Sequence, residues 1–389
     1  MQILQKFLKR AYAEIHLDRA RRNVEKIRSL LKGDTEIMAV VKANAYGHDD
    51  KTMARLFESV GIRYFAVSNI HEAVRLREAG IKGEILILGY TSPEYAAELS
   101  RENIINAIVS EEHARNLSLA AQSPVRCHIK IDTGMGRIGI REDTPEKCAE
   151  AIEEIISLKN LKVEGIFTHL SVADSLDKGD VEYTLHQRDF ILKVWEILKG
   201  KGINLTHLHF LNSAGGTYYS DERSTLARFG IMLYGLCPNY CLPLPVKLEP
   251  VMDLKAEIAY VETLKKGSFV SYGRTFEADR DIKAATITIG YADGYSRLLS
   301  SKAEVLVHGK RAKVIGRVCM DQMMVDVTGI DAKAGDIATI IGKEGNEEIT
   351  ADYLASLYGT IGYEVVCGIS KRIPRVVIDN GEIVDVLEY

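Results

Sequence analysis

Cysteine is scarce in this chain, with six residues among 389. So few cysteines do not make a disulfide framework in a protein of this length. Only Cys237 and Cys241 lie close together in the sequence. No second pair of cysteines or histidines with zinc-ligand spacing accompanies them, so we interpret both as structural thiols and expect no metal.

Long apolar runs and an excess of one charge are also missing. No uninterrupted apolar stretch approaches the length of a membrane span, and the basic first ten residues lack the apolar region and cleavage site of a signal peptide. The 50 lysines and arginines against 54 aspartates and glutamates leave a net charge of −4, so no basic surplus points to nucleic acid. The composition is that of an ordinary globular enzyme, for which we expect a cytoplasmic location.

The length favours two domains, and the sequence pattern changes near residue 244. Before that point, short apolar runs alternate with stretches of helical periodicity, such as 18–32, 72–79, 145–158 and 182–198. Thr144 followed by Pro145 is a good helix start, an N-cap with proline at the first position. Eight apolar runs are typical of strands: 37–41, 64–68, 84–88, 104–109, 125–132, 163–169, 205–212 and 226–231.

Eight strands with intervening helices fit a TIM-type (β/α)8 barrel in number and length, and we assign it to residues 1–244. The alternative is a doubly wound open sheet. Such a sheet usually has a glycine-rich turn after its first strand, and the turn at 42–47 is not one.

Residues 245–389 have a different pattern. Their apolar segments are short, rich in β-branched residues and punctuated by glycine: 256–261, 284–289, 303–307, 312–317, 323–327 and 337–341. Short strands at regular spacing predict a C-terminal all-β domain, which one helix over 351–358 is expected to interrupt. We expect the first residues of the chain to pack with this domain.

A lysine ends the first predicted barrel strand. Lys42 closes the apolar run 37–41 and opens the polar turn 43–48. Burial depresses the pKa of a lysine, and a neutral amine is a nucleophile that forms Schiff bases with aldehydes. Spacing alone also fits a lysine whose stem packs at the strand end while the amine stays in water. The rest of the chain decides between these roles.

The active site of a (β/α)8 barrel lies at the carboxyl ends of its strands, and phosphate is commonly bound after strands seven and eight. Those two loops supply small residues here. The Ser213 hydroxyl and the amides of Gly230 and Ile231 are candidates to cradle a phosphate. A phosphate pocket opposite Lys42 suits pyridoxal phosphate, whose aldehyde takes the lysine and whose ring stores the electrons of a carbanion.

At this point the sequence resembles the alanine racemase family, PLP-dependent racemases of fold type III. The segment 39–48 is similar to the family's cofactor-lysine motif. Any one of the matching motifs is weak, but together they are highly specific. They continue in order and at near-constant spacing through both predicted domains: Lys130 with 132–137, Thr168-His169, Asn212-Ser213-Ala214, Arg228-Phe229-Gly230-Ile231, Ser271-Tyr272-Gly273, 289–294 and Cys319-Met320-Asp321.

The resemblance implies a racemase that interconverts L-alanine and D-alanine and supplies D-alanine for peptidoglycan. Pyridoxal phosphate would form an aldimine with Lys42, whose amine, once freed by the substrate, would be one catalytic base. Tyr272 of the other subunit would be the second base on the opposite face of the substrate. His169 and Arg228 would help its phenol toward phenolate, since free tyrosine titrates near pH 10. A head-to-tail homodimer with two composite sites is therefore expected.

Further roles follow from the same resemblance. Arg228 would donate a hydrogen bond to the pyridine nitrogen without protonating the ring, which favours racemisation over transamination. Arg137 would bind the substrate carboxylate and brace the phenolic oxygen of the cofactor. The backbone amide of Met320, from the other subunit, would face the same carboxylate. Lys130 matches a position that is often carbamylated in the family, where the anion would orient Arg137.

The remaining matches concern the phosphate and the entrance. Tyr46 and Tyr363 would hold the phosphate. Residues similar to those that line the substrate entrance are Tyr291, Arg297, Asp321 and Arg375. The complete cofactor site implied is Lys42, Tyr46, Arg137, His169, Asn212, Ser213, Arg228, Gly230, Ile231 and Tyr363.

The chain departs from the family pattern at two positions. Asp49 stands where glycine is common, and Gly362 stands where asparagine is common. The second departure could shift Tyr363, so a racemase with broader specificity that also accepts serine stays open.

A metal-dependent hydrolase on the same barrel is the alternative from another class. His207 and His209 alternate on one strand and face one side, and a carbamate at Lys130 could bridge metals. Against this, acidic ligands near the strand ends are scarce. A protein that only binds pyridoxal phosphate leaves Tyr272 and the second domain unexplained, and a decarboxylase would not match the Arg137 and Tyr272 motifs.

Overall fold

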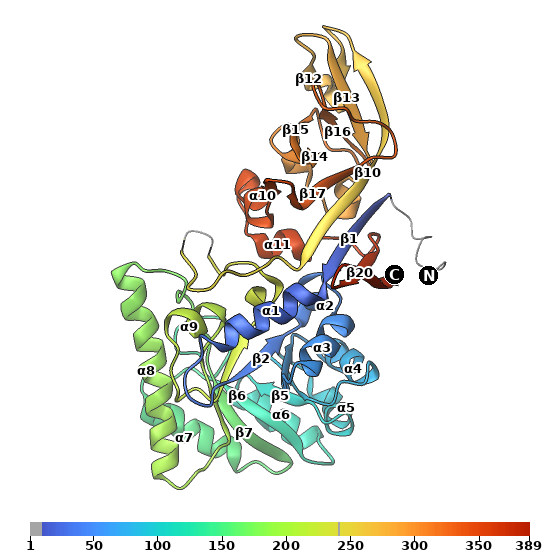
Figure 1. Ribbon diagram of the computed structural model, residues 1–389. Coiled ribbons are helices and arrows are strands. Elements are labelled where there is room, and N and C mark those ends of the chain that lie inside the picture. Colours follow the sequence, from blue (N-terminus) through green and yellow to red (C-terminus); the bar gives the residue numbers. More distant parts are fainter. Residues whose placement is uncertain (1–9, 240–241) are drawn as a thin grey trace.

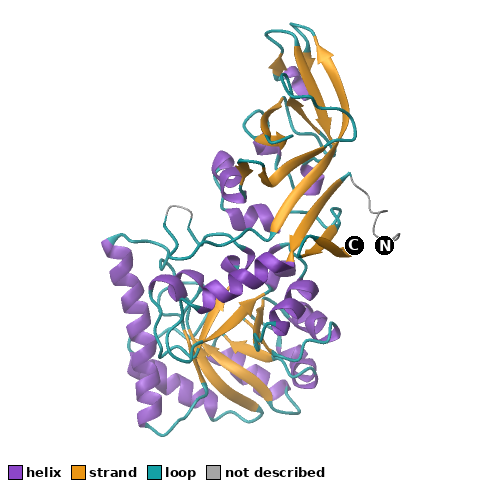
Figure 2. Ribbon diagram, in the orientation of Figure 1, coloured by secondary structure: helices purple, strands orange, loops and turns teal. Residues whose placement is uncertain are grey.

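The computed structural model describes residues 10–239 and 242–389 (Figure 1). Strands surrounded by helices form one part, and a long sheet that extends away from them forms the other (Figure 2). Cys237 is a free, half-buried thiol. Cys241 lies outside the described residues, so its interpretation as a structural thiol stays a prediction.

Eight parallel strands form the first sheet, in the order β8-β7-β6-β5-β4-β3-β2-β9. A bridge between Leu211 and Ala227, and a 2.8 Å hydrogen bond from the Thr225 amide to the Leu208 carbonyl, join the two edges. The predicted barrel is therefore confirmed, and each predicted run overlaps one strand. The strands are β2 (Glu36–Val40), β3 (Tyr64–Val67), β4 (Glu84–Ile87), β5 (Ile105–Ile108), β6 (Val125–Lys130), β7 (Leu161–Phe167), β8 (His207–His209) and β9 (Leu226–Phe229).

Helices cover the outside of the barrel (Figures 1 and 2). The predicted N-cap is confirmed, because the Thr144 hydroxyl accepts a hydrogen bond from the Lys147 amide at 3.3 Å and Pro145 begins the helix. None of the helices in the described part of the chain combines the length and the apolar character that a membrane crossing needs. The helices are α1 (Leu17–Arg28), α3 (Asp50–Ser59), α4 (Ile70–Glu78), α5 (Ala96–Arg101), α6 (Glu111–Ala120), α7 (Pro145–Ile156), α8 (Lys178–Gly200) and α9 (Ser213–Tyr218).

The second sheet has ten strands in the order β18-β17-β14-β15-β16-β13-β10-β1-β19-β20. The chain enters this sheet with β1, which pairs with β10 and β19, before it builds the barrel. β10 is longer than the predicted run because it pairs with β1, β13 and β17 along its length. The strands are β1 (Ala11–His16), β10 (Met252–Leu264), β13 (Ile282–Ile287), β14 (Glu304–Val307), β15 (Lys310–Ile315), β16 (Met323–Asp326), β17 (Ile337–Glu344), β18 (Glu347–Ile349), β19 (Arg375–Asp379) and β20 (Glu382–Leu387).

The second part of the chain, which corresponds to the predicted domain over residues 245–389, is rich in β-sheet but also contains helices. The predicted helix is confirmed as α10 (Ala351–Tyr358), and a second helix, α11 (Gly362–Cys367), follows it. The prediction of one helix was therefore wrong, because six residues are too few to show a helical period. A small hairpin of β11 (Phe269–Val270) and β12 (Phe276–Glu277) lies at the far end of this part (Figure 1).

Arg375 joins the second sheet to the barrel. The prediction that Arg375 lines the substrate entrance is wrong. The side chain is fully buried. Its Nε donates to the Gly47 carbonyl at 3.0 Å, just beyond the Lys42 turn. Its two terminal nitrogens donate to the carbonyls of Ile369, Ser370 and Ile373 at 2.5–2.8 Å. Buried carbonyls need such donors, and this need fixes Arg375 in the interior.

Replacing Arg375 with methionine should lower the free energy of unfolding by about 3 kcal/mol, because buried carbonyls lose their donor while the stem volume is kept. The measurement is the urea midpoint followed by circular dichroism. Arg372→Met is the control: Arg372 is exposed and pairs with Asp321, a contact worth at most about 1 kcal/mol. Equal losses for the two variants would contradict the bracing role of Arg375.

Candidate active site

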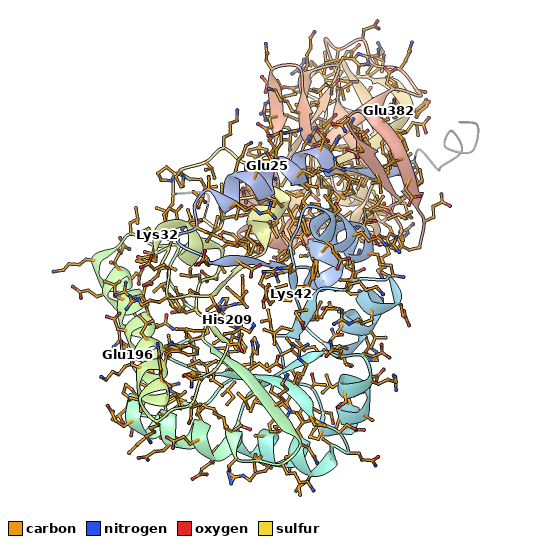
Figure 3. All side chains as sticks on the ribbon, turned by 60° about the horizontal axis from the view of Figure 1, so that its bottom comes forward. Glu25, Lys32, Lys42, Glu196, His209 and Glu382 are labelled. Carbon is orange, nitrogen blue, oxygen red and sulfur yellow. The ribbon has the colours of Figure 1, made fainter. Side chains whose placement is uncertain are left out.

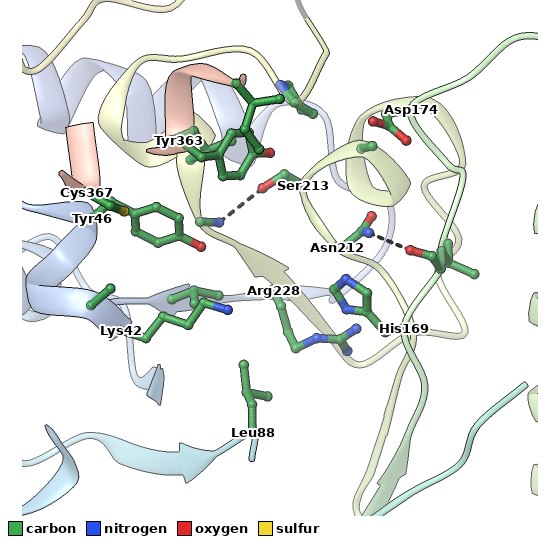
Figure 4. A pocket seen from close by; sticks show the side chains of 18 of the residues that line it. Lys42, Tyr46, Leu88, His169, Asp174, Asn212, Ser213, Arg228, Tyr363 and Cys367 are labelled. Atoms are coloured by element: carbon green, nitrogen blue, oxygen red, sulfur yellow. Dashed lines mark hydrogen bonds between the residues drawn. The ribbon is translucent and has the colours of Figure 1, made fainter. Parts of the chain in front are cut away.

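A cavity of about 500 Å³ opens at the carboxyl ends of the barrel strands, and α11 closes one side of it. Figure 4 shows Lys42 and His169 on either side of Arg228, with Tyr46 and Tyr363 above. The barrel therefore brings together residues that lie far apart in the sequence. The predicted residues that line the cavity are Lys42, Tyr46, His169, Asn212, Ser213, Arg228, Gly230, Ile231 and Tyr363.

Lys42 begins an unusual left-handed turn, α2 (Lys42–Tyr46). The φ angles of Ala43, Asn44, Ala45 and Tyr46 are 53°, 55°, 52° and 53°. This conformation costs an L-residue roughly 1–2 kcal/mol. Four such residues in succession persist only where the surrounding structure holds them.

Contacts from outside hold the turn. The His48 Nδ1 donates to the carbonyls of Ala45 and Tyr46 at 3.0 and 2.9 Å. Because both partners are acceptors, Nδ1 carries the hydrogen; burial lowers the pKa of His48 to about 4, so the ring is neutral. The Glu72 carboxylate, on α4, accepts a hydrogen bond from the Ala43 amide at 2.8 Å.

The environment of Lys42 favours a neutral amine. Burial lowers its pKa, and the positive charge of Arg137 lowers it further, while Glu72 and Cys367 oppose the shift. A lower pKa leaves more free amine at neutral pH, which is the nucleophilic form.

Arg228 is buried and held on several sides. One terminal nitrogen donates to the His209 ring at 2.8 Å and to the His209 carbonyl at 3.0 Å, and the other donates to the Thr168 carbonyl at 2.6 Å. Burial lowers the pKa of Arg228 to about 9, so the guanidinium stays charged at neutral pH. Its charge, after burial, lowers the pKa of His169 well below the ordinary value, so His169 is neutral.

Two buried histidines next to Arg228, His209 and His128, form a hydrogen-bonded chain with it, and Figure 3 shows His209 in the interior of the barrel. Arginine only donates, so the His209 Nδ1 accepts from it. The His209 Nε2 then donates to the His128 Nδ1 at 2.9 Å. Burial holds the pKa of both rings well below the ordinary value.

The pair His207 and His209, on which the metal-hydrolase alternative rests, therefore does not support it. His209 is committed to Arg228 and His128. Within the described residues, Glu14, His16 and Asp253 are the only group with the spacing of metal ligands, and they lie outside the barrel cavity. Lys255 and Arg19 neutralise those carboxylates.

Lys130 and Arg137 lie beside the cavity rather than in its wall. Lys130 is buried, and its amine donates to the Ile131 carbonyl at 2.9 Å. Burial, followed by the charge of Arg228, lowers the pKa of Lys130 to about 7. Arg137 is exposed on the loop after β6.

Gly230 and the hydroxyls of Ser213 and Tyr46 lie close together in the cavity, where the loops after β8 and β9 meet. The Gly230 amide donates to the Ser213 hydroxyl at 3.1 Å. Asn212 caps α9 by accepting from the Gly215 amide at 2.8 Å. A Cβ at Gly230 would lie 2.3 Å from the Tyr46 hydroxyl oxygen, so only glycine allows the tyrosine to reach this loop.

Tyr272 and Met320 are not brought to the cavity of their own chain. Tyr272 begins η3 (Tyr272–Arg274), which connects β11 with β12 at the far end of the second part (Figure 1). Its exposed fraction is 68%, and that of Met320 is 54%.

The predicted entrance residues also belong to the second part. Tyr291 and Arg297 are on η4 (Tyr291–Asp293) and η5 (Arg297–Leu299), and Tyr291 is exposed. Asp321 is occupied by an ion pair with Arg372 at 2.8 Å and by a longer one with Arg10 at 3.7 Å.

Sequence reasoning missed Glu72, Cys367 and the His209–His128 pair. The spacing of Asn69 and Glu72 was a usable signal, because it resembles a helix capping box. Cys367 lines the cavity, and burial raises the pKa of its thiol to about 11. No local pattern marks it.

The sequence matches the family models of the alanine racemase N-terminal domain over residues 15–238 and of the C-terminal domain over residues 251–377. It is 40% identical to the alanine racemase of Clostridium novyi over 99% of both chains. It is 42% identical to that of Desulfovibrio desulfuricans over 95% of this chain and 98% of that protein.

Solved structures agree with this result. The alanine racemase from Bacillus anthracis with bound L-Ala-P superposes with a TM-score of 0.92 at 35% identity, over 99% of each chain. A histidine racemase from Leuconostoc mesenteroides superposes with a TM-score of 0.84 at 29% identity, over 95% of this chain and 98% of that one. This chain belongs to the alanine racemase family.

Proposed function

We propose that this chain is a PLP-dependent isomerase that interconverts L-alanine and D-alanine. D-alanine formed in this way would serve peptidoglycan synthesis. The observation that carries the proposal is the Lys42 amine, which a strained turn presents to the cavity at the carboxyl ends of the barrel strands. Family membership over the full chain supports it.

The residues of the cavity fit pyridoxal phosphate. The pKa of the Lys42 amine is lowered, as attack on an aldehyde requires. The Ser213 hydroxyl, the Gly230 and Ile231 amides and the two tyrosines Tyr46 and Tyr363 surround the end suited to a phosphate. When bound, pyridoxal phosphate supplies an electron sink for the negative charge that develops at the substrate Cα.

Lys42 and Tyr272 would move the proton on opposite faces of the substrate Cα. The Lys42 amine removes or returns it on the face toward the barrel. The Tyr272 hydroxyl would act on the other face and would come from a second copy of the chain, because Tyr272 is not among the described residues that line the cavity of its own chain. We therefore propose a head-to-tail homodimer.

Arg228 would orient the cofactor, and Arg137 would orient the substrate. Arg228 is anchored by its two terminal nitrogens and would donate to the ring nitrogen of the cofactor without releasing its proton. Arg137, exposed at the mouth, would bind the substrate carboxylate together with the Met320 amide of the second copy. The exposed Tyr291 and Arg297 would line the entrance, with Asp321.

Lys130 is a site for a carbamate. Carbamylation joins a neutral amine to carbon dioxide and releases one proton, so it needs an amine that is unprotonated. The pKa of about 7 meets this requirement near neutrality, and Arg228 and Arg137 would pair with the anion formed.

The first test of the proposed function is the identity of the reactive lysine. The purified holoenzyme should be yellow, and borohydride should fix the cofactor on Lys42, as found by peptide mass. In deuterated water, L-alanine should gain deuterium at Cα as D-alanine appears. Lys42→Ala should lower this exchange by at least about 10³-fold, because the base and the cofactor anchor are lost together. A colourless protein that racemises nothing would contradict the proposal.

The second test asks whether each site is shared between two chains. Lys42→Ala and Tyr272→Phe should each be inactive as homodimers. A mixture dissociated and reassociated at equal amounts should regain about a quarter of wild-type activity, because half of the dimers carry one intact site out of two.

This mixing experiment separates the two geometries without a structure of the dimer. If both residues served one chain, no mixed dimer would contain an intact site and no activity would return. Mixing Lys42→Ala with itself, carried through the same dissociation, is the matched control.

The third test uses the pKa of Lys130. With 13C-labelled bicarbonate, a carbamate NMR signal should be present at pH 8 and fall as the pH drops below 7, because protonation of an amine with a pKa of about 7 removes the reactive form. An ordinary lysine would instead gain the signal only toward pH 10. Lys130→Met should lack the signal at every pH, and its persistence in that variant would exclude Lys130.

A further inference from the structure

Glu72 connects two loops at the barrel mouth through its carboxylate. The residue is 9% exposed. One oxygen accepts from the Ser68 amide at 2.7 Å and from the Ser68 hydroxyl at 2.8 Å. The other accepts from the Ala43 amide, directly after Lys42, at 2.8 Å.

The contact with Ala43 is more than a helix cap. In a capping box, the glutamate would accept from the amide of the N-cap residue, which here is Asn69. Asn69 does accept from the Glu72 amide at 3.0 Å, but the Glu72 carboxylate turns away to Ser68 and Ala43. The side chain therefore links α4 to the Lys42 turn.

Ala43 is the residue at which the backbone turns left-handed, so its amide sets the direction of the whole turn. A hydrogen bond to a carboxylate is roughly twice as strong as a neutral one. No proline or glycine within the turn enforces its shape. An acceptor fixed on a neighbouring helix is then the means by which the start of the turn is held against a more relaxed conformation.

We propose that Glu72 is a positioning residue for Lys42: by holding the Ala43 amide, it fixes the left-handed turn that aims the lysine into the cavity. The inference rests on the proposed role of Lys42. Glu72 is not among the described residues that line the cavity, and it acts only through the backbone of the turn.

The test compares Glu72→Gln with Asn69→Ala in the holoenzyme. Glutamine keeps the volume but offers one acceptor oxygen for two loops, so either Ser68 or Ala43 loses its partner. Asn69→Ala removes the cap of the same helix and leaves the Glu72 carboxylate in place. The readouts are kcat, KM, the rate at which the cofactor leaves the protein, and the thermal midpoint.

We expect Glu72→Gln to lower kcat about 10-fold to 100-fold with little change in KM, because the amine is displaced from its reacting position. Cofactor release should be faster by about the same factor. Asn69→Ala should lower the thermal midpoint by a comparable amount while kcat and cofactor release stay near wild type.

Three outcomes would overturn the inference. Glu72→Gln could keep wild-type kcat and cofactor retention while its Ala43 amide exchanges fast, or Asn69→Ala could match its losses, which would make Glu72 merely structural. Should Glu72→Gln fail to fold, hydrogen exchange of the wild-type Ala43 amide decides: slow exchange supports the bond, and exchange as fast as that of exposed loops overturns it. A wild-type protein without racemisation would instead refute the proposed function, so the two failures are distinguishable.

Discussion

Burial, reinforced by the positive charge of nearby arginines, sets the pKa values of the groups at the barrel mouth. Burial and the charge of Arg228 lower the pKa values of His169 and Lys130, and burial and Arg137 do the same to Lys42. Buried cations that repel one another are stabilised by an anionic occupant. The phosphate and the substrate carboxylate of the proposed function would meet that need. In the proposed function, the burial that lowers the pKa values of the two lysines would therefore also favour an anionic cofactor.

The second domain also supports the left-handed turn that begins at Lys42, through contacts with the two residues Gly47 and Asp49 that follow it closely. Arg375 of β19 donates to the Gly47 carbonyl, and the Tyr389 hydroxyl donates to the Asp49 carboxylate at 2.9 Å. Asp49 has a φ of 76°, where glycine is the easier choice. Its carboxylate offsets that strain by capping α3 through the Thr52 amide at 2.9 Å. The departure from the family pattern at this position is therefore compensated by contacts within the chain, and the second domain becomes part of the support of Lys42.

Much of the fold could be predicted from the sequence, because strands and helix caps leave local patterns. The eight apolar runs and the Thr144 cap follow from periodicity and capping preferences alone. The left-handed turn could not be predicted, because Ala43 and Ala45 carry no positional signal and long-range contacts hold them. The same is true of Arg375, whose burial depends on carbonyls from two domains. Gly362 is explained only in three dimensions: a Cβ there would lie 2.2 Å from an Asp352 carboxylate oxygen, which takes the space of a side chain.

The pKa values of the groups that line the cavity support the proposal that the site is shared between two chains. Racemisation needs a second base on the face opposite Lys42. Among the described residues that line the cavity, Tyr46 and Tyr363 are poor candidates because burial raises their pKa values well above the ordinary one. Burial likewise raises the pKa of Cys367, and burial together with the charge of Arg228 holds the pKa of His169 well below its ordinary value, which makes His169 a weak base. The proposed second base would then be a group that is still exposed on the single chain, as Tyr272 is, two-thirds exposed at the far end of the second part.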